Sequence, residues 1–190
     1  MKSKVYDNED FINVSYSGQK VGNTEFDSCT FLNCDFSNST FPESDFINCR
    51  FEGCNFAMVV LSDSGLKDVR FLDCKLIGIN FDYCADFLFA VDFQKCMLDY
   101  SSFQKKRMKK TRFMDCSLKE VDFTGVDLSM AVFNNCNLSR AVFHDCNLEK
   151  ADFRTASEYS IDPEVNKVKK ARFSLDGVAG LLGKYNIVIE

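Results

Sequence analysis

The chain has 190 residues, a net charge of −5 and 46% hydrophobic residues, whereas glycine and proline are scarce, at nine and two. This composition is typical of one folded domain and excludes a disordered chain. No apolar run approaches the roughly 20 residues that a membrane span needs, and the opening MKSKVYDNEDFINVSY has no apolar core of a signal peptide. We therefore expect a cytoplasmic protein that makes no membrane contact.

The first predicted element is a repeat that covers residues 1–81. A large apolar residue returns every five positions from Phe26 to Phe81, as at Phe46, Phe51 and Phe56, and weaker units begin at Tyr6. The residue two positions earlier is small, as at Cys49 and Cys54. A period of five fits neither an α-helix nor a simple strand. We interpret it as a repeat with two inward side chains in every five residues.

The repeat breaks once, over residues 82–87. The step from Phe81 to Leu88 is seven residues instead of five, which predicts an irregular unit with two extra residues. This unit is either a tolerated insertion or a contact loop. The frame resumes over residues 88–175, where phenylalanine and leucine alternate as the large residue. The predicted core of this second stack includes Phe113, Leu118, Phe133, Leu138 and Phe153.

The triplets CDF, SDF, CNF, VDF, CNL and ADF recur through both series. They resemble the core of the pentapeptide-repeat family, and the resemblance covers at least residues 24–153. It implies an all-β fold, a right-handed quadrilateral β-helix with four pentapeptides in each coil. Residues 20 apart then stack at about 4.8 Å per coil. The alternation places phenylalanine columns on two opposite faces and leucine columns on the other two, with small residues such as cysteine beside them.

Charged residues supply candidate contact sites on the outside of the repeat. Residues 104–113 contain six basic residues and no acidic one, and Lys105, Lys106, Arg107 and Lys110 are the candidate basic contacts. They form either a solvated patch or a site for phosphate or an acidic partner. Lys106 falls on an inward position, where an unpaired lysine is unfavourable, so we expect a local outward bulge there. Glu43 and Asp63, which the coil geometry stacks directly, are the candidate acidic contacts.

The last element is a tail over residues 176–190, which follows one further coil that closes at Phe173. The sequence GVAGLLGKY has apolar residues at helical spacing, which predicts a short helix. The segments IDPEVN and IVIE resemble the C-terminal ends of the Qnr (quinolone-resistance) and microcin-immunity pentapeptide proteins. This resemblance implies a homodimer formed through the tail; the alternative is a plain cap. The residues assigned to the cap or dimer contact are Val178, Leu181, Leu182, Tyr185 and Ile187.

A catalytic role is not expected from this sequence. There are ten cysteines and one histidine, His144, but no C-x-x-C pair, no glycine-rich phosphate loop and no nucleophile–base arrangement. We therefore predict no metal and no cofactor, and we interpret the cysteines as core residues.

The resemblance instead implies an acidic rod that mimics DNA and binds a type II topoisomerase, DNA gyrase or topoisomerase IV, protecting it from quinolones or a gyrase poison without binding nucleic acid itself. The alternative is a non-catalytic scaffold for another protein partner. A continuous acidic stripe favours mimicry, whereas scattered charge with an exposed apolar patch favours a different partner.

Overall fold

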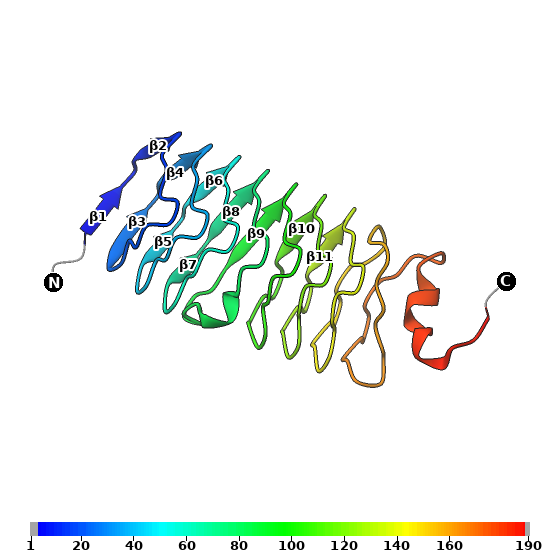
Figure 1. The fold of residues 1–190 in the computed structure, drawn as a ribbon. Helices are drawn as coiled ribbons and strands as arrows, with labels where there is room; N and C mark the ends of the chain where they lie inside the picture. The colour runs from blue at the N-terminus through cyan, green and yellow to red at the C-terminus, as the bar shows by residue number, and fades with distance from the viewer. Residues whose placement is uncertain (1–3, 189–190) are drawn as a thin grey trace.

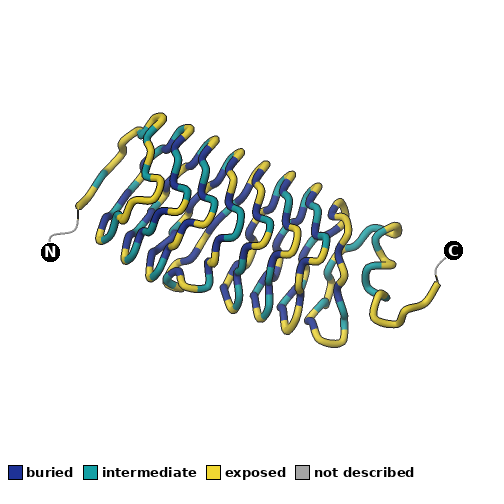
Figure 2. The backbone as a smooth tube through the Cα atoms, in the orientation of Figure 1, coloured by how far each residue is buried: buried dark blue, intermediate teal, exposed yellow. Residues whose placement is uncertain are grey.

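The computed structural model describes residues 4–188, which form a right-handed quadrilateral β-helix. Short parallel strands stack coil upon coil into a rod, with the two ends of the chain at opposite ends (Figure 1). From the second coil onward, buried and exposed stretches alternate along the coils (Figure 2). This alternation follows from the sequence, because two of every five side chains are apolar and point inward. The predicted fold class is confirmed.

Two parallel sheets form two of the four sides of the rod. One contains β1-β3-β5-β7 and the other β11-β10-β9-β8-β6-β4-β2. Phe31 pairs with Phe51 in the first coils, whereas Phe71 pairs with Phe93 across the frame break, where the spacing between partners grows by two. The strands are β1 (Lys4–Asp7), β2 (Asp10–Ile12), β3 (Thr24–Asp27), β4 (Thr30–Leu32), β5 (Asp45–Ile47), β6 (Arg50–Glu52), β7 (Gly65–Lys67), β8 (Val69–Leu72), β9 (Val91–Gln94), β10 (Arg112–Met114) and β11 (Val132–Asn134).

Isolated parallel bridges build the remaining sides. We number the faces in the order in which the chain visits them from β2 onward: the first is the sheet from β2 to β11, and the second runs through the bridges from Ser15–Asp35 onward. The third face runs through the bridges from Lys20–Thr40 onward. The fourth begins with the sheet from β1 to β7 and continues through Arg107–Asp127 and Asn147–Lys167. Each coil therefore visits all four faces before the next coil begins.

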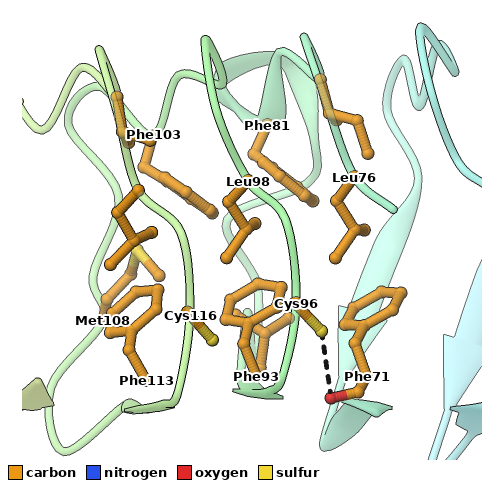
Figure 3. Packing of buried hydrophobic residues seen from close by; sticks show 14 of the residues in the cluster. Phe71, Leu76, Phe81, Phe93, Cys96, Leu98, Phe103, Met108, Phe113 and Cys116 are labelled. Atoms are coloured by element: carbon orange, nitrogen blue, oxygen red, sulfur yellow. Dashed lines mark hydrogen bonds between the residues drawn. The ribbon is translucent and has the colours of Figure 1, made fainter. Parts of the chain in front are cut away.

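The core consists of side chains stacked in columns along the rod. On the first face Phe93 stacks on Phe71 and Phe113, with ring centroids 5.3 Å apart in both pairs (Figure 3). On the third face Phe81 stacks on Phe103 at 4.5 Å. Leucines fill the second face between them (Figure 3). The predicted alternation of phenylalanine and leucine columns is therefore confirmed.

Cysteines fill the space between the columns. The Cys96 thiol donates to the Phe71 carbonyl oxygen at 3.5 Å (Figure 3). All ten cysteines are buried and unpaired as disulfides. Burial raises the pKa of the Cys49 thiol to about 12, and a thiol that stays protonated is a weak nucleophile. These side chains therefore serve as small core residues.

The frame break differs from the sequence-based expectation at one residue. After the 3₁₀-helix η1 (Phe81–Tyr83), the chain leaves the coil and returns at Phe89, which is buried. Leu88, which we expected as the first inward residue of the second series, is 63% exposed. That prediction was wrong because the two extra residues are accommodated by a loop, which postpones the return to the core. We call residues 82–90 the insertion loop; it is the green segment before β9 in Figure 1.

The tail covers the C-terminal end of the rod. It contains two 3₁₀-helices, η2 (Val178–Leu181) and η3 (Gly183–Tyr185), in place of a single helix. The Ile161 amide donates to the Gly180 carbonyl oxygen at 2.9 Å. The Lys184 ammonium contacts Asp162 at 2.8 Å and Glu164 at 2.5 Å. Beneath the tail, the further coil closes as expected, with Phe173 stacked on Phe153 at 5.4 Å.

Candidate interaction surface

Charge is divided unequally between the two halves of the chain. Residues 1–103 contain 16 acidic and 8 basic residues, whereas residues 104–190 contain 12 acidic and 15 basic residues. The net charge is therefore −8 for the first half and +3 for the second. The net charge of −5 for the whole chain is the sum of these two values. The N-terminal end of the rod therefore attracts cations, and the C-terminal end attracts anions.

The acidic side chains gather where the third face meets the fourth in the N-terminal stack. Glu43 and Asp63 are exposed and occupy the same corner of successive coils, both with left-handed backbone, at φ 52° and 55°. Four further acidic residues lie along the adjoining fourth face. We call this set the acidic surface: Glu25, Asp27, Glu43, Asp45, Asp63 and Asp68.

The acidic column does not continue along the whole rod. Tyr83 follows Phe81 by two residues, as Asp63 follows Leu61, so Tyr83 is the next residue along this corner, and its carbonyl oxygen accepts from the Asp63 amide. By the longer register across the frame break, Lys105 occupies the corner of the next coil. An aromatic and a basic side chain therefore end the acidic surface at the insertion loop.

Basic side chains occupy the fourth face beyond the insertion loop. Arg107 and Lys167 lie on this face through the bridges Arg107–Asp127 and Asn147–Lys167. All are exposed, and none has an ion pair within the part of the chain that the structure describes. We call this set the basic surface: Lys105, Arg107, Lys109, Lys110, Lys150, Lys167, Lys169 and Lys170.

Lys106 does not bulge outward, contrary to the expectation from its sequence position. Its side chain is 2% exposed, and its ammonium donates to the Cys84 carbonyl oxygen and to Asp86 Oδ1, both at 2.6 Å. The nitrogen also lies 5.4 Å from the centre of the Phe89 ring. The prediction was wrong because it treated the lysine as unpaired. The insertion loop brings a carboxylate and a carbonyl oxygen to the position above it, and these satisfy the buried charge.

The tip of the insertion loop is apolar and exposed. Phe87 is 72% exposed, Leu88 63% and Tyr83 66%. A hollow of about 460 Å³ beside the tip is lined by Asp86, Phe87, Leu88, Lys105 and Arg107. The sequence located the irregular unit and the basic residues but not this aromatic tip. The available signal was the run ADFLFA, in which three large apolar residues fall too close together for all of them to point inward.

The tail presents a second exposed apolar area. Val178, Tyr185 and Ile187 are 42%, 53% and 56% exposed, whereas Leu181 and Leu182 are partly buried. Tyr185 is also tethered, because its hydroxyl donates to Glu164 Oε1 at 3.0 Å. The tail therefore covers the last coil with some apolar side chains and leaves others facing outward.

Within residues 4–188 the structure brings together no group of three or more His, Cys, Asp or Glu side chains that could hold a metal ion. His144 projects from the third face with its side chain 57% exposed, and its ring lies 3.6 Å from Asp145. No helix within the same residues is long and apolar enough to cross a membrane. The features left for function are therefore the acidic surface, the basic surface, the insertion loop and the tail.

Comparisons with known proteins agree with this architecture. The family model for the pentapeptide repeat region matches residues 24–87 and 85–160. No curated protein sequence matches the chain.

Among solved structures, the chain is similar to two trypsin-treated forms of QnrB1, a plasmid-mediated fluoroquinolone resistance protein. The first has a TM-score of 0.66 at 17% identity, covering 100% of this chain and 91% of that chain. The second has a TM-score of 0.64 at 15% identity, covering 99% and 98%. The chain is also similar to HetL, a pentapeptide repeat protein involved in heterocyst differentiation regulation in the cyanobacterium Nostoc sp. strain PCC 7120, with a TM-score of 0.63 at 14% identity, covering 92% and 88%.

Proposed function

Because the chain belongs to the pentapeptide-repeat family, we propose that it is a non-catalytic solenoid that acts by binding another protein through its side faces. The partner that we propose is a type II topoisomerase, DNA gyrase or topoisomerase IV. In this proposal the acidic surface enters the cationic groove that normally holds DNA, and the protein shields the enzyme from a quinolone or another gyrase poison. It binds no nucleic acid itself and needs no cofactor.

The observation that carries this proposal is the acidic surface. Its carboxylates project from successive coils, which repeat at the spacing of parallel strands, about 4.8 Å. A group of negative charges on successive coils, in which Asp45 alone has an ion pair within residues 4–188, with Lys67 at 2.9 Å, is complementary to a groove built for phosphates, and such complementarity speeds encounter and fixes register. The similarity in fold to QnrB1, a fluoroquinolone resistance protein, also favours this class of partner.

We further propose that only the N-terminal stack enters the groove. The acidic surface ends at the insertion loop, and the basic surface begins directly beyond it on the same face. A cationic groove repels the basic surface, since like charges brought together across an interface are unfavourable. The protein would therefore mimic a short length of DNA, and its C-terminal stack would stay outside.

The tail is proposed to join two copies of the protein. Its outward side chains include Leu175 and Val188, which are 89% and 85% exposed, besides Val178 and Ile187. Exposed apolar residues clustered at one end of a rod are typical of a contact surface. Light scattering of a chain that ends at Ser174 tests this, because loss of the tail should halve the mass. An unchanged mass would refute tail-mediated pairing.

We place this function in the cytoplasm. Ten unpaired, buried cysteines suit a reducing compartment, where thiols are kept from forming disulfides.

The experiment is gyrase supercoiling in the presence of a quinolone, with the purified protein titrated in. We expect restored supercoiling, and we expect the double reversal E43K/D63K to abolish it. The matched control is E120K/E158K, which makes the same change in charge at two exposed left-handed corners of the C-terminal stack; it should restore supercoiling as the unmodified protein does. Absence of any effect at every concentration would leave the alternative, a scaffold for a different protein.

A further inference from the structure

We propose that the insertion loop and the two basic residues beside it form a second docking site, which takes an acidic segment of a partner protein that also carries apolar side chains. The site consists of Phe87 and Leu88 at the loop tip and Lys105 and Arg107 on the next coil, around the hollow described above. It differs in sign from the acidic surface, and it does not depend on the topoisomerase proposal.

The loop tip combines two features that are unfavourable in the free protein. Phe87 exposes 72% of its surface to water. Leu88 adopts left-handed backbone at φ 58°, which is unfavourable in a residue other than glycine. An isolated exposed side chain needs no explanation, and left-handed backbone recurs at the corners of the coils, but large exposed apolar side chains in adjacent residues are typical of binding sites.

The loop is also held in place from below. The Ala85 amide donates to the Ser64 carbonyl oxygen and the Ala90 amide donates to the Leu66 carbonyl oxygen, both at 2.9 Å. The buried Lys106 ammonium ties Asp86 to the rod from the other side. The tip is therefore presented by a backbone that is already fixed. A fixed site loses little conformational entropy on binding, which favours affinity.

The charges around the hollow determine the kind of partner. Lys105 and Arg107 flank the buried Lys106, point outward and have no ion pair within residues 4–188. Asp86, the acidic residue in the hollow, is already paired with Lys106. Two free cations next to an apolar wall are complementary to carboxylates spaced among apolar side chains.

A nucleic-acid strand fits this hollow less well than such a peptide. Single-stranded DNA or RNA is held by a cationic groove together with aromatic rings on which the bases stack. Here the apolar wall is one ring and one aliphatic side chain, Phe87 and Leu88, and Leu88 offers no stacking face.

The test is fluorescence anisotropy of the full chain with three labelled dodecapeptides. The probe alternates glutamate and leucine; one comparison peptide replaces leucine with serine, and the other replaces glutamate with lysine. We expect the probe to bind and both comparison peptides to bind at least about tenfold more weakly, the loss that follows removal of a central contact. Added salt should weaken binding of the probe.

Two matched pairs of variants locate the site. L88S should weaken the probe at least about tenfold, whereas M58S should not, although Met58 is also exposed and has nearly the same backbone, φ 59° against φ 58°. Likewise K105E should weaken binding and K95E should not, although both lysines occupy exposed left-handed corners. All four residues are on the surface, so thermal unfolding should confirm that each variant folds.

Three results would overturn the proposal. The first is that no probe binds, or that the control variants weaken binding as much as the loop variants do. The second is that labelled single-stranded DNA binds more tightly than the probe and competes with it for the loop. The third is that the mass of the protein rises with concentration and that L88S abolishes the rise, since a second copy would then occupy the site.

Discussion

The two coil stacks share one core design but differ in nearly everything that faces outward. In the N-terminal stack, twelve of the fifteen left-handed corners between Asn8 and Gly78 are Asn, Asp or Gly; in the C-terminal stack, this holds for four of the fourteen between Lys95 and Lys170. Asn, Asp and Gly tolerate this backbone best. Six corners of the C-terminal stack are lysine or arginine instead.

This difference separates the positions that determine the fold from those that determine binding. Inward positions are the same in kind on both sides of the insertion loop, so both stacks close into the same square coil. On the fourth face, the outward positions carry the acidic surface before the loop and the basic surface after it. Four of the less favourable corner residues of the C-terminal stack belong to its basic surface, and we propose that the charge there serves an interaction. Five experiments test the difference between the two stacks.

The largest effect is expected in the aromatic columns. Phe51 has rings beside it in its own coil, Phe46 at 5.6 Å and Phe56 at 4.9 Å, whereas Phe113 has Met108 and Leu118 at those positions. Alanine at either site should lower the free energy of unfolding by about 3–5 kcal/mol. Leucine should be tolerated better at 113 than at 51, by about 0.5–1.5 kcal/mol, because Phe51 has five aromatic partners and Phe113 has four, so one more aromatic pair is lost at 51. Urea unfolding measures both; equal losses with leucine would contradict this ranking.

The junction between the stacks depends on the buried lysine. D86A leaves the Lys106 ammonium with one partner and should lower the free energy of unfolding by about 1.5–3 kcal/mol, the contribution of a hydrogen bond to a charged group. K106M removes the charge and should be nearly neutral or stabilising, since an apolar residue often replaces a buried ion pair without loss. Denaturant unfolding of the two variants compares them directly. A greater loss from K106M than from D86A would contradict this account of the junction.

At the end of the C-terminal stack, the tail depends on a close backbone approach. A Cβ atom at Gly180 would lie 2.4 Å from the Tyr159 carbonyl oxygen, whereas one at Gly183 would lie 3.4 Å from its nearest neighbour. G180A should therefore destabilise the packed tail by about 1–3 kcal/mol, and G183A should have little effect. Amide hydrogen exchange over residues 178–185 measures this. Equal exchange in both variants would show that the tail does not pack on Tyr159.

Ionisation of the cysteine thiols at high pH should lower the free energy of unfolding of both stacks. Burial raises the pKa of Cys49 to about 12 and that of Cys146 to about 11, from 9.0. Below pH 9 both states keep the proton; above it only the unfolded state releases it, so stability falls as pH rises from 9 towards those values. The fall is about 1.4 kcal/mol per pH unit for each thiol. Urea unfolding at pH 8 and pH 10 should show it, with a smaller fall in C49A; a fall of the same size would exclude Cys49.

The smallest effect concerns the corners themselves. K150N places a residue that tolerates left-handed backbone at φ 60° and should stabilise the protein by about 0.5–1 kcal/mol, part of the roughly 1–2 kcal/mol that this conformation costs other residues. N48K makes the reverse change at φ 53° in the N-terminal stack and should destabilise by a similar amount. Thermal unfolding measures both. Shifts of the same sign would show that corner residues do not distinguish the stacks.

Most of the fold could be predicted from the sequence, because the period of five is carried by large side chains that tolerate little change. The columns headed by Phe46, Phe51 and Phe113 could be located in this way. The exposure of Leu88 and the burial of Lys106 could not be predicted, because both depend on where the loop backbone places Asp86 and Phe89. The five-residue period around Lys106 does not indicate that the insertion loop supplies the Asp86 carboxylate to it.

The contact surfaces were only partly predictable for a related reason. Glu43 and Asp63 could be placed in one column from their spacing, since the register of the coils is regular. The end of that column at Tyr83 depends on the longer register across the insertion loop, and the exposure of Phe87 depends on the path of that loop. Packing restricts the inward side chains to a pattern that can be recognised in the sequence, whereas it does not restrict the outward side chains in this way.

We propose that the two halves of the rod meet partners of opposite charge, and that the N-terminal half meets the topoisomerase. Carboxyl footprinting of the full chain, alone and with DNA gyrase, tests it most directly, because the extent of labelling of each acidic side chain is read by mass spectrometry. We predict that gyrase reduces labelling of Glu43 and Asp63 and leaves Glu120 and Glu158 unchanged. Unchanged labelling at Glu43 and Asp63, or protection confined to the C-terminal stack, would contradict the claim.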